Sequence, residues 1–216
     1  MLGLHVVFAV DRAGLVGEDG ETHHGVFDVG FLRQAQGLEI LCPACTTELN
    51  AMLRWAIRSC TGPVAVRYPR GGDGLLTGSN WDENTTVVCH RNGKYGAIVT
   101  YGTLINNALE AAEILAEQGI NVAVVRLLKV NSLPIGDLEA ALSGQKRILI
   151  AEEAIGGIAE SLAWQLSQRL PDVTIHTADL GREYVTHGDM TSLYKHYGLD
   201  ARSLAEKFME VRKVEK

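Results

Sequence analysis

Apolar residues in the first third of the chain fall into short runs separated by segments with helical spacing. The runs predict strands at residues 4–10, 38–41 and 63–67, the first of them buried. A short helix is expected over residues 28–35. Residues 47–59 place their apolar side chains on one face of a longer helix, which opens with a threonine and a glutamate that suit a helix start.

Residues 71–86 interrupt this pattern with a glycine-rich and polar stretch that is typical of a linker. We place a domain boundary within it, near residue 78. Two β-like runs follow the linker, and the dipeptide Asn92-Gly93 lies between them. Because Asn-Gly favours the tight turns that join paired strands, the sequence predicts a β-hairpin here.

Helical segments and apolar runs then alternate to the end of the chain. We expect helices at residues 103–118, 135–142 and 157–170, strands at 122–128, 147–151 and 173–177, and two closing helices. Gly119 follows the first of these helices and would stop it. Such alternation builds parallel βα units. The predicted fold class is therefore α/β, with a mostly parallel sheet and an antiparallel edge strand.

Size and charge restrict the classes of function. A chain of 216 residues can hold one large or two small domains, and 46% hydrophobic residues suffice for a real core. The net charge of -6 argues against nucleic acid or an anionic membrane surface as the main partner. No apolar run reaches the roughly 20 residues of a membrane span. The N-terminal residues do not resemble a secretory signal, and four cysteines in this length are typical of free thiols in a reducing cytoplasm.

A glycine-rich loop follows the first predicted strand and carries the strongest candidate chemistry. Its glycines are Gly14, Gly17, Gly20 and Gly25, and its polar residues include Arg12, Asp19, His23 and His24. In α/β sheets, ligands bind at loops beyond the carboxyl ends of strands. This loop therefore predicts a site for a small, anionic, proton-exchanging substrate.

Two arginines are the candidate anion ligands. Arg12 and Arg70 each lie just past the end of a predicted strand, and neighbouring strands of a parallel sheet would place them side by side. A guanidinium fork binds phosphate oxygens in a bidentate way that lysine cannot copy. The alternative is that both are solvated and paired with Asp11 or Asp73. Arg67, nearer the interior of its strand, is interpreted as structural.

Asp19 and His23 are the candidate proton-handling residues. Histidine is the side chain that titrates near neutral pH without help from its surroundings, and a nearby carboxylate can orient it. The alternative is an ordinary loop histidine with no chemical role. For His24 the sequence leaves both possibilities open.

The same residues carry a family resemblance. The stretch DRAGLVGEDGETHHGVFDVGFLR and the later RYPRG at residues 67–71 resemble the signature motifs of the 1-deoxy-D-xylulose-5-phosphate synthase family, in the transketolase superfamily. The resemblance covers essentially the whole chain. It implies that residues 1–78 are the C-terminal part of a pyrimidine-binding domain, a partial sheet segment. Residues 79–216 would then form a transketolase C-terminal domain.

The resemblance also implies a function. The full enzymes of this family condense pyruvate with glyceraldehyde 3-phosphate, release carbon dioxide and use thiamine diphosphate with Mg²⁺. In them, the positions of Arg12 and Arg70 hold the substrate phosphate, and those of Asp19 and His23 face the acceptor aldehyde. The cofactor-activating groups would lie upstream. We therefore expect this chain alone to bind no cofactor and to be inactive. It would act as a homodimer or together with an N-terminal half.

A non-catalytic alternative stays open. The chain would then be a partner or scaffold subunit that a separate N-terminal polypeptide completes. Three strands and one good helix in residues 1–78 are too few to cover both faces of a sheet, which favours binding to another chain. Glu152, Glu153 and His187 also match the family, and we interpret them as helix-capping and interdomain contacts.

Two motifs imitate other sites. Gly72-Asp73-Gly74 with Asn106-Asn107 is similar to the magnesium and diphosphate motif of thiamine enzymes. That motif needs its GDG between a strand and a helix, whereas this one lies in the linker. Asn106 and Asn107 share a helical face with glutamates, so we interpret them as solvated surface and expect no metal site.

The second imitation is Cys42-Pro43-Ala44-Cys45, between a predicted strand and a helix start. That position lowers a thiol pKa in thioredoxin-like folds, and it raises the hypothesis of thiol redox activity. The surrounding pattern is not a thioredoxin fold. A zinc site with Cys60 or Cys89 lacks a second close pair, so ordinary thiols are the favoured interpretation.

Overall fold

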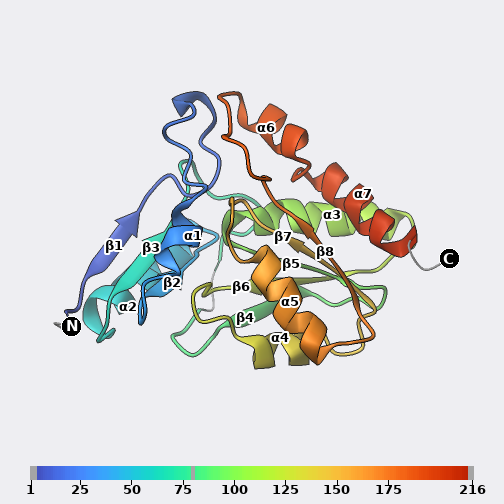
Figure 1. The fold of residues 1–216 in the computed structure, drawn as a ribbon, viewed down its shortest axis with the longest axis horizontal. Coiled ribbons are helices and arrows are strands. Elements are labelled where there is room, and N and C mark those ends of the chain that lie inside the picture. Colours follow the sequence, from blue (N-terminus) through green and yellow to red (C-terminus); the bar gives the residue numbers. More distant parts are fainter. Residues whose placement is uncertain (1–3, 79–80, 214–216) are drawn as a thin grey trace.

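The computed structural model describes residues 4–78 and 81–213, which form two units lying side by side, each built on a sheet (Figure 1). The first unit contains β1 (Val7–Val10), α1 (Asp28–Leu32), β2 (Glu39–Leu41), α2 (Thr46–Arg58) and β3 (Val64–Arg67). Its sheet has the order β1-β3-β2, and both pairings are parallel. Apolar residues of α2 pack against buried Val64 and Val66 of the central strand.

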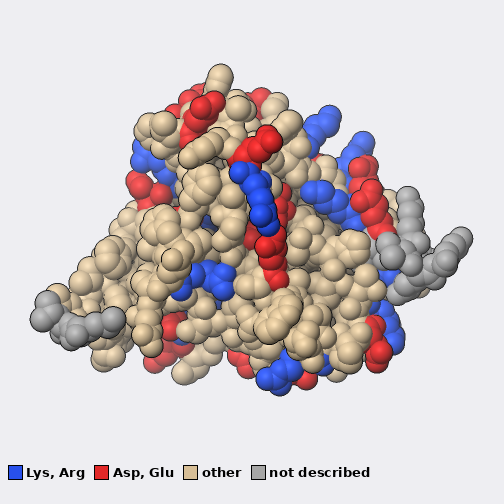
Figure 2. Space-filling view, in the orientation of Figure 1, with Lys and Arg blue, Asp and Glu red and all other residues tan. Residues whose placement is uncertain are grey.

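The first strand differs from its prediction. It was expected to be buried, yet β1 lies at the edge of its sheet and Phe8 is 46% exposed. The surface over β1 is largely free of charged side chains (Figure 2). An apolar run cannot by itself tell an edge strand from a central one, because both faces of either can be apolar.

The second unit is a five-stranded sheet with the order β4-β6-β5-β7-β8. Its elements are β4 (Val87–Arg91), β5 (Ala97–Tyr101), α3 (Ile105–Glu117), β6 (Ala123–Leu127), α4 (Ile135–Ala141), β7 (Arg147–Ala151), α5 (Ala159–Arg169), β8 (Thr174–Ala178), α6 (Met190–Tyr197) and α7 (Ala201–Lys213). Strand β4 is antiparallel to β6, and the other pairings are parallel. The predicted α/β class, with its antiparallel edge strand, is confirmed.

The hairpin predicted at Asn92-Gly93 is wrong. Strand β6 lies between β4 and β5, so the two strands that flank this turn do not pair with each other. The backbone N–H groups of Lys94 and Tyr95 both donate to Asn121 O instead, at 2.9 and 3.1 Å. The chain bends at Lys94 and Tyr95, directly after the dipeptide. The partner was decided by β6, whose five residues are all buried and which takes the place between the two strands.

Two helical layers cover the second sheet (Figure 1). Side chains of β5 alternate between them, as the two-residue period of a strand requires. Ile98 packs in a core cluster with residues of α3 and α7, whereas Val99 packs on the opposite face with residues of α4 and α5. Both faces of the sheet are therefore covered by helices and shielded from water, which explains why these strands are apolar along their whole length.

Backbone hydrogen bonds join the two units. Cys42 N–H donates to Leu128 O at 3.0 Å, and Val130 N–H donates to Ile40 O at 3.1 Å.

The boundary predicted near residue 78 adjoins residues 79 and 80, which lie outside the described residues, and it stays a prediction. No helix within the described part of the chain has the length and apolar character needed to cross a bilayer.

Candidate functional site

The glycine-rich loop, residues 11–25, leaves the carboxyl end of β1 and projects beside α6 (Figure 1). Its base is closed by backbone hydrogen bonds. Gly14 N–H donates to Gly25 O at 2.8 Å, and Gly25 N–H lies 3.0 Å from Arg12 O. A Cβ on Gly25 would lie 2.2 Å from Arg12 O, so this crossing admits only glycine.

Three of the four predicted site residues meet at this loop. Arg12 Nε donates to Asp19 Oδ2 at 3.2 Å, and Arg70 donates to the other carboxylate oxygen, Oδ1. The strands that carry the arginines are direct neighbours, with Val10 opposite Arg67. The expected convergence of Arg12 and Arg70 is therefore present, with one carboxylate between them.

The alternative pairings are found only in part. Arg12 also contacts Asp11 at 3.0 Å, so this arginine has both an exposed neighbour and the loop carboxylate. Arg70 pairs with Asp19 and not with Asp73. The side chains of Arg12 and Arg70 are 43% and 57% exposed, so an anion from solution can reach both guanidinium groups.

The electrostatic state of Asp19 follows from its partners. Burial alone would raise the pKa of this carboxyl, but hydrogen bonds and positive charge from Arg12 and Arg70 outweigh burial and hold the pKa below its ordinary value. Asp19 is thus ionised at neutral pH. The two arginines share the charge of Asp19, and Asp11 balances a second positive charge beside Arg12, so an incoming anion has to displace a carboxylate.

His23 lies on the exposed part of the same loop. Its backbone N–H donates to Gly20 O at 3.1 Å, and its Nδ1 lies 3.0 Å from the hydroxyl of Thr22. Both oxygens of the carboxylate expected to orient it contact arginines. His23 is therefore near the cluster in the chain, open to solvent, and oriented by Thr22.

His24 is held inside the loop. Val16 N–H donates to its Nδ1 at 3.0 Å, which requires Nδ1 to carry a lone pair. Its Nε2 lies 3.2 Å from Thr186 O and must donate, because a carbonyl only accepts. Burial lowers the pKa of His24 below its ordinary value. His24 is therefore a neutral structural histidine that ties the loop to the second unit.

Arg67 has the structural surroundings that its place in the strand predicts. It is 5% exposed and donates to Asp28 Oδ2 and to Gly25 O, both at 2.8 Å. Its second contact supports the base of the glycine-rich loop. Arg67 thus differs from the nearby Arg70, although both belong to one short motif.

Glu152 and Glu153 follow β7 and point to different elements. The carboxylate of Glu152 accepts the N–H groups of Ile158 and Ala159, both at 2.8 Å, and so caps α5. Glu153 accepts Leu15 N–H at 2.6 Å, a contact between the two units. These contacts agree with the capping and interdomain interpretation made from the sequence.

His187 and Asp189 lie in the segment before α6, next to the loop. A Cβ on Gly20 would lie 3.9 Å from Cβ of His187. The carboxylate of Asp189 accepts Ser192 N–H at 2.9 Å and caps α6. The group of this segment that contacts the loop, the backbone carbonyl of Thr186 beside Nε2 of His24, had no sequence signal, because every residue has such a carbonyl.

The carboxylate of the GDG motif, Asp73, is engaged by contacts within the chain. Asp73 Oδ1 accepts the backbone N–H of Thr46 at 2.6 Å and its hydroxyl at 2.7 Å, so this carboxylate contacts the start of α2. Across the part of the chain that the structure describes, no group of three or more His, Cys, Asp or Glu side chains is placed to hold a metal ion. The donor set does not fit Mg²⁺ with a diphosphate.

Asn106 and Asn107 correct one prediction. They were expected on a solvated face, yet both are half-buried and bind other segments. Asn106 Oδ1 accepts Leu76 N–H at 3.1 Å, and Asn107 Nδ2 donates to Leu199 O at 2.9 Å. Helical spacing assigned their face correctly but could not show that the linker and the segment after α6 pack onto it.

The cysteine pair has the properties of ordinary buried thiols. Cys42 and Cys45 are both free and buried. Burial raises the pKa of Cys42 to about 12, so its reactive thiolate is not formed at neutral pH. This environment is the opposite of the one that activates a redox cysteine.

Comparison with known proteins identifies the class. Residues 2–72 match the pyrimidine-binding domain of transketolase, and residues 85–204 match the transketolase C-terminal domain. The chain belongs to the transketolase family.

The similar curated proteins are 1-deoxy-D-xylulose-5-phosphate synthases. Those of Chlorobium phaeovibrioides and Chlorobaculum tepidum are each 39% identical to the chain, over 94% and 97% of its length. The chain spans about a third of these relatives, 33% and 34%. Among solved structures, a split-gene transketolase described as an inactive beta4 tetramer matches with a TM-score of 0.85 and 24% identity, over 99% of this chain and 69% of that one.

Proposed function

We propose that this chain supplies the acceptor side of a thiamine-diphosphate-dependent transfer of the 1-deoxy-D-xylulose-5-phosphate synthase type. That reaction joins pyruvate to glyceraldehyde 3-phosphate and releases carbon dioxide. The single observation that carries the proposal is the convergence of Arg12 and Arg70, from adjacent strands, on one carboxylate of the glycine-rich loop. The identity of the similar proteins supports the choice of substrates.

Each residue of the site then has a defined task. Arg12 and Arg70 bind the phosphate of the acceptor through charge-assisted hydrogen bonds, which are stronger than neutral ones. Asp19 holds the two guanidinium groups in place before the phosphate arrives and moves aside as it binds. His23, exposed on the same loop, exchanges a proton with the oxygen of the acceptor aldehyde.

The cofactor is assigned elsewhere. Thiamine diphosphate, when bound with Mg²⁺, supplies the electron sink of such reactions. Since the residues seen in the structure do not fit its diphosphate and metal, we assign no step on the cofactor to this chain. We propose that a polypeptide of these 216 residues has no pyruvate-dependent turnover by itself, and that it works as a dimer or with a cofactor-binding partner.

The proposed organisation follows the resemblance. Residues 1–78 would be the end of the pyrimidine-binding domain, and residues 79–216 the C-terminal domain. Four cysteines in the sequence, described as free thiols, fit a reducing cytoplasm as the location.

Calorimetric titration tests the acceptor role directly. We expect the chain to bind glyceraldehyde 3-phosphate and to bind glyceraldehyde, which has no phosphate, far more weakly. Turnover is followed in parallel as release of carbon dioxide from pyruvate. Equal affinity for the two aldehydes would overturn the phosphate assignment, and turnover by the 216-residue polypeptide would overturn its proposed inactivity.

A second candidate function rests on the first sheet. Among the residues that the structure describes, strand β1 has a neighbouring strand on one side only, and Leu4 and Phe8 are 61% and 46% exposed. Such an edge can accept another strand. As a non-catalytic partner subunit, the chain would bind a separate N-terminal polypeptide along β1. Size-exclusion chromatography with and without such a polypeptide discriminates, since a monomer that ignores it contradicts this candidate.

A further inference from the structure

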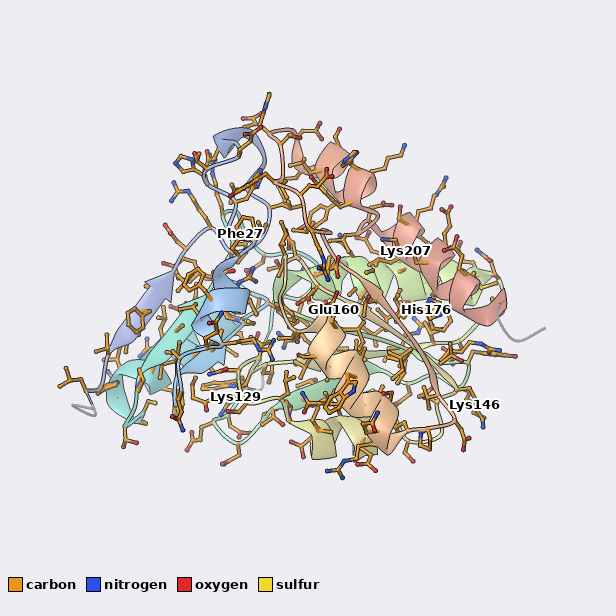
Figure 3. The ribbon with its side chains drawn as sticks, in the orientation of Figure 1. Phe27, Lys129, Lys146, Glu160, His176 and Lys207 are labelled. Atoms are coloured by element: carbon orange, nitrogen blue, oxygen red, sulfur yellow. The ribbon has the colours of Figure 1, made fainter. Side chains whose placement is uncertain are left out.

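The glycine-rich loop rests on the second unit over most of its length. Glu153 after β7 accepts Leu15 N–H, and Thr186 O lies 3.2 Å from Nε2 of His24. Phe27, labelled in Figure 3, follows the loop and packs edge-to-face on Tyr184, with ring centroids 5.6 Å apart. The loop conformation is therefore set as much by the second unit as by β1.

Among these contacts, the one made by the Glu153 carboxyl group is the shortest. Its Oε1 accepts Leu15 N–H at 2.6 Å and the hydroxyl of Tyr194 at 3.2 Å. A Cβ on Gly14 would lie 2.4 Å from the carboxyl carbon of Glu153. Gly14 is thus required both by its positive φ of 77° and by the carboxyl group that packs against it.

The site residues lie a few positions further along the same loop. Leu15 and Val16 are buried, whereas the segment that carries Asp19 and His23 turns back toward solvent. Because the loop has glycine at four positions, its own backbone preferences do not fix it. Fixed points at Leu15 and Val16 therefore determine where Asp19 can reach the arginines.

We infer that Glu153 is a positioning residue, which clamps the glycine-rich loop to the second sheet and so holds Asp19 and His23 in place for the acceptor. This inference rests on the acceptor role proposed above and deepens it. The second unit then contributes to substrate binding, although none of its side chains belongs to the arginine cluster.

The groups that face Glu153 make the clamp sensitive to pH. They are Arg67 from β3, Asp28 from α1 and Tyr194 from α6. Burial raises the pKa of Glu153 to about 7, against the opposing effects of the hydrogen bond from Leu15 and the charge of Arg67. Release of the loop would expose the carboxyl and return its pKa toward 4.5. By linkage, docking of the loop is strongest below about pH 4.5 and weakens as the pH rises to about 7.

The test measures amide hydrogen exchange of Leu15 in the whole chain, corrected for the intrinsic effect of pH. In Glu153→Ala the acceptor is lost, and we expect exchange to accelerate by roughly tenfold or more. Glu153→Gln keeps an acceptor without the charge, so it should restore protection and, at about pH 8, exceed the wild type. Glu160→Ala, which removes an exposed glutamate from α5, is the matched control and should change nothing.

Titration with glyceraldehyde 3-phosphate separates the clamp from the function. If Glu153→Ala weakens binding and Glu153→Gln restores it, the positioning role is supported. If Leu15 exchange is the same in Glu153→Ala and Glu160→Ala, the inference is overturned. If exchange responds as expected while no variant, including the wild type, binds the aldehyde phosphate, the clamp stands and the proposed function fails.

Discussion

Arginine–carboxylate pairs occur in two very different settings in this molecule. At the joint between the two units, Arg126 donates to both oxygens of Glu48, at 2.6 and 2.8 Å, and both residues are almost fully buried. At the glycine-rich loop, Arg12 and Arg70 share Asp19 in the open. The chemistry is the same and the surroundings are opposite.

The difference separates architecture from binding. A buried pair cannot exchange its partner for water, so loss of one member leaves an uncompensated charge. An exposed pair contributes little to stability because water and salt compete for both members. The loop arginines are thus free to exchange a carboxylate for a phosphate, whereas Arg126 and Arg67 are committed to the fold.

The largest expected effect is on the buried pair. Arg126→Met should lower the free energy of unfolding by about 3–5 kcal/mol, because the buried carboxylate of Glu48 loses the positive charge of its arginine. Urea unfolding followed by circular dichroism measures this loss. The double variant Arg126→Met with Glu48→Leu should recover a large part of it, since it buries no charge.

The loop pair provides the matched control. Arg70→Ala removes an arginine from an exposed pair and should change the free energy of unfolding by about 1 kcal/mol or less. If Arg70→Ala and Arg126→Met destabilise the chain equally, the distinction between a buried pair that stabilises the fold and an exposed pair that does not is wrong.

The second effect is on binding. Arg12→Ala and Arg70→Ala should each weaken binding of glyceraldehyde 3-phosphate by about 1.5–3 kcal/mol, the contribution of a hydrogen bond to a charged group. Calorimetric titration gives the affinity, and the urea midpoint verifies that the fold is intact. Unchanged affinity in both variants would place the phosphate elsewhere.

Arg70→Lys sharpens this result. Lysine keeps the charge but lacks the planar fork, so it should recover only part of the lost affinity. Full recovery would show that charge alone is sensed, and the geometric argument for a bidentate phosphate site would fail.

Most of the fold could be predicted from the sequence, because helices and strands have distinct periods in their apolar residues. Strand β7 and the helix before Gly119 are where the periodicity places them. Strand pairing could not be predicted, as Asn92-Gly93 illustrates. The dipeptide precedes a local bend at Lys94 and Tyr95, but which strand lies beside β4 depends on residues that are distant in the sequence.

The site was predictable to the extent that its residues have chemically distinctive side chains. Arg12, Asp19 and Arg70 do converge, as expected from strands that end at one edge. The clamp at Glu153 could be placed at the interdomain contact, but its partner is the backbone of Leu15. A backbone N–H has the same chemistry at nearly every residue, so no sequence pattern indicates such a partner.

A smaller effect is expected when the shared carboxylate is neutralised. Asp19→Asn keeps the side-chain shape and an oxygen acceptor that can still order an arginine, and it removes the charge that competes with phosphate for Arg12 and Arg70. We expect affinity for inorganic phosphate to rise a few-fold, measured by calorimetry at low ionic strength. Weaker phosphate binding would mean that Asp19 chiefly orders the arginines and does not compete with the anion.

The smallest expected effect is the contribution of His24 to the pH dependence of the free energy of unfolding. Because burial holds the pKa of His24 below 6.5, the unfolded chain takes up its proton first as the pH falls. Stability from this residue is therefore present above about pH 6.5 and is lost below it. Glu153 acts in the opposite direction, since its raised pKa adds stability as the pH falls below about 7.

His24 and Glu153 change the free energy of unfolding in opposite directions as the pH falls, so the effect of His24 is measured in a variant that lacks the effect of Glu153. In Glu153→Gln, stability should fall more steeply between about pH 6.5 and pH 5 than in the wild type. Adding His24→Asn, which keeps an acceptor near Val16 N–H, should flatten that slope. Urea midpoints across this range measure both changes. An identical slope in the single and double variants would show that His24 already carries a proton in the folded loop, which would contradict the hydrogen bond from Val16.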